Sequence, residues 1–136
     1  MKSNSVFTYL SLLGAITVAL GAFGAHGLEE KVSPERIQIF KLGISYQFYH
    51  LIPMFVLYLK NKDEMFFPKI DSWALSSFML GIILFSGSLY LLSIREIVHF
   101  GFFMKIIGPA TPVGGISFIV GWILMAYSTF FKKPNE

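Results

Sequence analysis

Residues Trp73–Ile94 read WALSSFMLGIILFSGSLYLLSI, without one Asp, Glu, Lys or Arg. An α-helix needs about 20 predominantly apolar residues to cross the hydrocarbon core of a bilayer, and this stretch is long enough. Irregular backbone cannot face lipid, because its amide and carbonyl groups would find no hydrogen-bond partners there. We therefore expect a transmembrane helix along the whole stretch.

Three further stretches have the same apolar character, and the charged residues lie between the stretches or at the ends of the chain. A chain of 136 residues is enough for one ordinary domain. The sequence therefore predicts a single all-α domain, residues 1–136, folded as a transmembrane four-helix bundle. The expected spans cover about residues 6–26, 42–60, 73–94 and 111–131.

The composition favours lipid as the surroundings of this chain. Hydrophobic residues make up 54% and charged residues 14%, whereas a soluble domain carries about a quarter charged residues. The net charge of +3 is spread over the connections, and nucleic-acid binding would need clustered Lys and Arg. The chain has no cysteine, which excludes disulfides and thiolate metal sites. We expect the lipid bilayer, and no nucleic acid, as a partner.

The first apolar run could also be taken for a secretory signal, because Lys2 precedes it and small residues follow near Ala22 and Gly24. Since the run Val6–Ala25 is long enough to span a membrane, we interpret it as the first transmembrane helix. Six cations lie on the side of the termini and five on the other. This small excess favours both termini inside.

The connections contain signals for helix starts. Ser33-Pro34 is typical of an N-cap followed by proline at the first helical position, so helix two should begin near Pro34. Thr111-Pro112 has the same pattern, and helix four should begin there. The segment Arg95–Ala110 mixes charged and aromatic residues, which predicts that it lies in the headgroup region. Pro53 should kink helix two.

Small residues recur on one face of several expected helices, at intervals of three, four or seven positions. Membrane helices pack where small side chains let their backbones approach closely, because lipid provides no hydrophobic force between them. We therefore expect helix packing at Gly14, Gly21, Gly24, Gly81, Gly114 and Gly121.

Helix two carries a polar face, since Tyr46, Gln47 and His50 fall on one side at 100° per residue. With His26, at the end of helix one, they form a candidate polar centre. Ionisable groups inside a membrane often mark pathways or sites, so a proton relay, a ligand or headgroup pocket, and a haem or metal site are open interpretations. Alternatively, His50 is neutral and hydrogen-bonded for structural reasons.

No catalytic, cofactor or metal site is predicted. The histidines His26, His50 and His99 have no HExxH spacing and no nearby carboxylate cluster. The nearest phosphate-loop candidate, Gly108–Gly115, lacks the final Lys followed by Ser or Thr. No Ser-His-Asp set can be assembled, because the acidic residues occur only in the connections and the tail.

Five motifs in order resemble the YgdD-like small inner-membrane proteins, a family of unknown function with relatives in animals. The motifs are GAFGAHGL (21–28), GISYQFYH (43–50), LFSGSLYLL (84–92), GPATPVGG (108–115) and GW (121–122). The resemblance runs from about Leu12 to Tyr127. It implies four spans, a plasma (inner) membrane location and no established reaction. The segment Arg95–Ile107 departs from it, because it is longer than the link expected in this family. The family's motif positions fall here on His26, Tyr46, Gln47, His50, Ser86, Ser88, Thr111 and Trp122.

Two functions of different classes are open. The first is a non-enzymatic multi-pass protein that supports membrane or envelope organisation by packing with itself, lipids or partner proteins. The second is a small carrier or binding protein for a proton-linked solute, lipid or haem, centred on the polar face of helix two. A lipid-directed enzyme would need Glu29, Glu30 or Glu35 beside His26, and we expect these carboxylates to be solvated.

Overall fold

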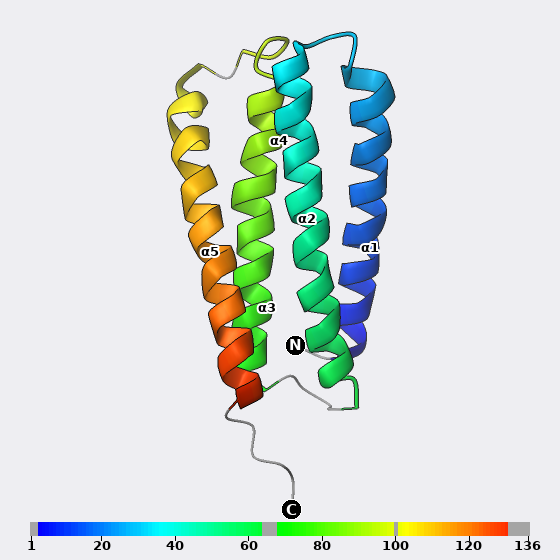
Figure 1. Ribbon diagram of the computed structural model, residues 1–136, viewed down its shortest axis with the longest axis vertical. Helices are drawn as coiled ribbons and strands as arrows, with labels where there is room; N and C mark the ends of the chain where they lie inside the picture. Colours follow the sequence, from blue (N-terminus) through cyan, green and yellow to red (C-terminus); the bar gives the residue numbers. More distant parts are fainter. Residues whose placement is uncertain (1–2, 64–67, 100, 131–136) are drawn as a thin grey trace, which may run out of the picture.

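The computed structural model describes residues 3–63, 68–99 and 101–130. Four helical rods stand side by side and alternate in direction, so that the N-terminus and the end of the last helix lie at the same end (Figure 1). Four helices are long and apolar enough to cross a membrane, as the sequence predicts: Ser5–Leu28, Pro34–Lys60, Lys69–Ser93 and Gly101–Phe130. Every element in the described ranges is a helix or a turn, which confirms the all-α bundle.

The rods are built from α-helices with short π-helical and 3-10 segments. In the first rod, α1 (Ser3–Ala22) continues into the π-helix η1 (Phe23–Leu28), and the second is the single helix α2 (Pro34–Lys60). The third consists of α3, the π-helix η2 and α4, and the fourth is α5 preceded by the 3-10 turn η3. Their bounds are Lys69–Gly81, Ile82–Ser86, Gly87–Ser93, Met104–Phe130 and Gly101–Phe103.

The two predicted helix starts have different outcomes. Helix α2 begins at Pro34 as expected, with Ser33 at the N-cap position, although the Ser33 side chain makes no capping bond to the helix. The expected start of helix four at Thr111 is wrong, because α5 begins at Met104 and contains Pro109 and Pro112. Proline fixes a helical φ and removes one donor, and burial of apolar residues such as Ile107 helps to offset the missing bonds. The expected last residue of that span, Phe131, lies outside the described residues.

Aromatic rings fill the space beside glycines where the rods meet. A Cβ atom at Gly121 would lie 2.8 Å from the ring of Phe78, and one at Gly81 would overlap the ring of Phe118. These two contacts are reciprocal, since Gly81 and Phe78 belong to α3 and Phe118 and Gly121 to α5. The glycines thus leave room for the large side chains of the neighbouring helix. The resulting van der Waals contacts hold the helices together in lipid, where no hydrophobic force drives their association.

The buried side chains form a main core in the half of the bundle near the termini and a smaller one at the opposite end. Helix α1 is the least covered span. Of its most apolar 18-residue window, 17% is buried, against 39% for α2. It lies beside α2 at one edge of the bundle (Figure 1). Most of α1 is therefore available to lipid or to another membrane protein.

Candidate functional site

Gln47 links three helices through hydrogen bonds inside the bundle. Its Nε2 donates to Oγ1 of Thr17 on α1 at 2.7 Å, and its Oε1 accepts a bond of 2.8 Å from the hydroxyl of Tyr90 on α4. The Thr17 hydroxyl in turn donates to the carbonyl of Leu13 at 2.8 Å. Gln47 is 2% exposed, so these partners replace the water that its amide would otherwise bind.

His50 is packed as an aromatic residue. Its Nδ1 lies 2.7 Å from the carbonyl oxygen of Tyr46, and because a carbonyl only accepts, this nitrogen carries the proton. The ring stacks on Phe118 of α5 with centroids 3.5 Å apart and an interplanar angle of 8°. Tyr46 stacks on Phe85 at 4.5 Å. The imidazole therefore helps to join α2 to α5.

The four residues of the predicted polar centre do not share one site. Tyr46, Gln47 and His50 lie on α2, but Gln47 bonds to α1 and α4 whereas His50 bonds to its own helix and stacks on α5. His26 is exposed on η1. Across the ranges that the structure covers, no three His, Cys, Asp or Glu residues lie close enough to hold a metal ion.

The six predicted packing glycines divide into two groups. The buried group faces aromatic residues of neighbouring helices: a Cβ at Gly24 would lie 2.8 Å from the Phe40 ring, one at Gly114 would overlap the backbone of Phe85, and Gly81 and Gly121 meet the rings described above. Apart from the backbone of their own helix, no described atom lies within 4 Å of a Cβ built at Gly14 or Gly21. A Cβ at either position would therefore meet no neighbouring helix within the described chain.

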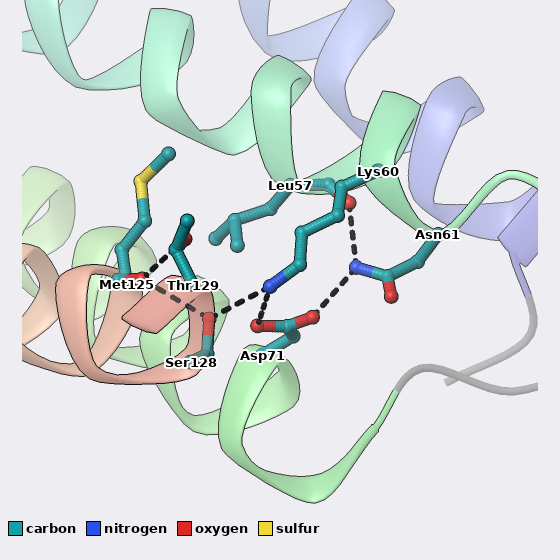
Figure 2. Close-up of polar contacts among 7 residues, drawn as sticks. All are labelled: Leu57, Lys60, Asn61, Asp71, Met125, Ser128 and Thr129. Carbon is teal, nitrogen blue, oxygen red and sulfur yellow. Dashed lines mark hydrogen bonds and ion pairs between the residues drawn. The ribbon is translucent and has the colours of Figure 1, made fainter. Parts of the chain in front are cut away.

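A buried ionic network, which the sequence did not predict, joins three helices at the end near the termini (Figure 2). The Lys60 ammonium donates to Asp71 Oδ1 at 3.2 Å and to the Ser128 hydroxyl at 2.9 Å. Asn61 donates to the other carboxylate oxygen at 2.8 Å. Asp71 is 1% exposed and occupies the first turn of α3, where the helix dipole favours a negative charge.

Glu96 plays the corresponding part at the opposite end of the bundle. Its carboxylate accepts bonds from the backbone amide of Ser33 at 2.9 Å, from the Ser33 hydroxyl at 3.1 Å and from Arg36 Nε at 3.1 Å. The Ser33 amide and, to a lesser extent, the Arg36 guanidinium hold the pKa of Glu96 below its ordinary value. The link between the α4–η3 connection and the start of α2 is therefore charged at neutral pH.

Comparisons with known proteins place the chain in a family. A family model described as "Protein of unknown function (DUF423)" matches residues 20–115. The UPF0382 membrane protein YwdK of Bacillus subtilis is 40% identical over 88% of this chain and 92% of its own length. A UPF0382 membrane protein of Haemophilus influenzae is 35% identical over 96% of this chain and 97% of its own.

The UPF0382 inner membrane protein YgdD of Escherichia coli is 34% identical over 92% of this chain and 88% of its own length. No solved structure gives a significant match. These relatives match nearly full length and are named membrane proteins, in agreement with the four helices that can cross a bilayer. The chain belongs to the DUF423 family of UPF0382 membrane proteins, as the five sequence motifs indicate.

Proposed function

We propose that the protein is a non-enzymatic, multi-pass protein of the plasma (inner) membrane that supports membrane or envelope organisation. It acts by packing with itself, with lipids or with partner membrane proteins, and both termini lie inside. The observation that carries the proposal is that polar side chains in the bundle form hydrogen bonds and an ion pair from one helix to another. Gln47 bonds to both Thr17 and Tyr90, and Lys60 bonds to Asp71.

The carrier hypothesis draws on the same polar groups, and their bonding favours the packing role. Both ends of the Gln47 amide and Nδ1 of His50 are engaged within the bundle. A ligand that used the Gln47 amide would first have to break bonds that join helices, and one that used Nδ1 of His50 would have to break its bond to Tyr46 within α2. Breaking contacts between buried polar groups costs free energy.

Helix α1 supplies the surface through which the protein would pack with others. It is the least covered span. Gly14 and Gly21, which have no neighbouring helix beside them, lie seven residues apart, about two helical turns. Small exposed residues flank them: Ser11, Ala15 and Ala22 on α1 and Ala25 on η1. A neighbouring membrane helix could approach this backbone closely and gain van der Waals contact there.

Leucine substitutions at two glycines separate this role from the internal fold. We expect Gly21→Leu to leave the melting temperature in detergent within a few degrees of the original protein, because a Cβ added at Gly21 has no described atom of another helix within 4 Å. The same variant should lose association in liposomes, measured by energy transfer between labelled copies and by recovery of co-purifying membrane proteins.

The matched control is Gly121→Leu. Its side chain would enter the ring of Phe78, and overpacking of this kind costs about 1–3 kcal/mol or more. The control should therefore lower the melting temperature clearly. Unchanged association of a stable Gly21→Leu variant, both with itself and with co-purifying proteins, would contradict the packing role of α1.

A further inference from the structure

We propose that the cavity at the end of the bundle opposite the termini binds the phosphate group of an anionic membrane lipid. The cavity has a volume of about 480 Å³ and lies between the start of α2, the connection that follows α4 and the start of α5. Arg36, Arg95 and His99 line it together with Glu96 and Met104. Two guanidinium groups and one imidazole thus line the cavity together with one carboxylate.

Arg36 provides the recognition geometry. Its side chain is 15% exposed, and its Nε donates to Glu96 at 3.1 Å. A guanidinium has five N–H donors, and within the described residues no hydrogen bond is formed by the four on the two Nη atoms. Largely buried donors need partners, and a phosphate can accept two parallel bonds from one guanidinium. The Nη edge is therefore suited to a phosphate oxygen pair.

Glu96 holds the arginine in place without occupying that edge. Its two oxygens already accept bonds from the Ser33 amide, the Ser33 hydroxyl and Arg36 Nε. The carboxylate is thus bonded on the side of α2, the exposed Arg95 adds positive charge at the cavity, and the exposed His99 adds an imidazole N–H donor. This arrangement attracts an anion although Glu96 lies beside the arginine.

The position of the cavity favours a lipid over a free phosphate ion. Arg95, Glu96 and His99 lie between the end of α4 at Ser93 and the start of α5, and Arg36 and Met104 lie in the first turns of α2 and α5. The cavity therefore lies where the spans leave the hydrocarbon. Phe102 and Phe103, which are 71% and 68% exposed, follow directly, and aromatic side chains favour the membrane–water interface. Lys105 lies 5.8 Å from the centre of the Phe102 ring. A lipid can place its phosphate in the cavity and its chains against these apolar residues.

Native mass spectrometry of the full chain with added lipids tests the proposal. Phosphatidylglycerol should bind about tenfold more tightly than zwitterionic phosphatidylcholine, a difference of about 1.4 kcal/mol. Both lipids have a phosphate, but the choline cation of phosphatidylcholine is repelled by the like charges of Arg36 and Arg95 at the cavity. Inorganic phosphate and glycerol phosphate, which have no acyl chains, should not displace the bound lipid at comparable concentrations. Displacement by either would overturn the assignment to a lipid.

Variants locate the site. Arg36→Gln and Arg95→Gln should each reduce the preference for phosphatidylglycerol several-fold, whereas Lys41→Gln, at an exposed cation of α2 outside the cavity, should not. Arg95 is exposed and takes no part in the hydrogen bonds of Glu96 with Ser33 and Arg36, so its variant remains informative if Arg36→Gln weakens the start of α2. Equal affinity for the two lipids, or equal losses in Lys41→Gln and Arg95→Gln, would overturn the proposal.

This inference rests on the proposed function only in naming lipids as partners. The Gly21→Leu variant should bind phosphatidylglycerol as the original protein does, because Gly21 is not among the cavity residues. Failure of the lipid experiment would therefore leave the association experiment on α1 unaffected, and the reverse also holds.

Discussion

Replacing Asp71 by alanine is expected to lower the free energy of unfolding by about 3 kcal/mol. The change leaves the ammonium of Lys60 and the amide of Asn61 without the carboxylate that they share, and removal of one partner from a buried ion pair costs about 3–5 kcal/mol. The lower end of that range applies because the Lys60 side chain is 21% exposed. Unfolding in lipid–detergent mixtures, followed by circular dichroism, measures the loss.

A double substitution tests the cause. In Lys60→Met with Asp71→Leu both charges are absent, and apolar pairs of similar size often replace buried ion pairs at little cost. The double variant should therefore recover much of the stability that Asp71→Ala loses. If Asp71→Ala were as stable as the original protein, the ionic network would not hold the ends of α2, α3 and α5 together.

Gly114→Ala is expected to have a comparable effect for a steric reason. A Cβ at this position would overlap the backbone of Phe85 in η2, and a backbone cannot move aside as the tip of a side chain can. Because the rods would have to separate locally, we expect a loss of about 3 kcal/mol, the upper end of the usual cost of overpacking. The melting temperature in detergent should fall accordingly.

The neighbouring glycine provides the control. At Gly115 the nearest atoms to an added Cβ are those of the Phe85 ring at 3.9 Å, which is ordinary van der Waals contact. Alanine is a better helix former than glycine by about 1 kcal/mol, so Gly115→Ala should be neutral or slightly stabilising. Equal destabilisation by the two alanines would contradict close packing of η2 against α5 at Gly114.

The helices were predictable because the length and polarity of each stretch suffice to identify a span. Ser33-Pro34 also located the start of α2, since a proline at the first helical position is a local signal. The same signal failed at Thr111-Pro112, because seven residues before Thr111, from Met104 onward, also become helical. Local patterns do not report how packing of residues such as Ile107 extends a helix.

The contacts between helices were much less predictable than the helices. The packing glycines predicted for helix one divide, because Gly24 is buried whereas a Cβ at Gly14 or Gly21 would meet no neighbouring helix. The spacing shows that these residues lie on roughly the same side of helix one. It does not show which of them α2 covers. In the sequence, Lys60 ends the second expected span and Asp71 lies in the connection that follows. Their contact depends on how the helices pack, and only the approach of α5 brings Ser128 to Lys60 and closes the network.

The central claim, that α1 packs against other proteins in the membrane, can be tested by photo-crosslinking. The chain has no cysteine, so purified Gly14→Cys can be coupled selectively to a benzophenone maleimide and then reconstituted with solubilised native membranes. Ile123→Cys on α5, where the native side chain is 62% exposed, reports ordinary contact with lipid. We predict discrete protein adducts, of a second copy or a partner, at position 14 and few at position 123. The same adduct pattern at both positions would contradict the claim.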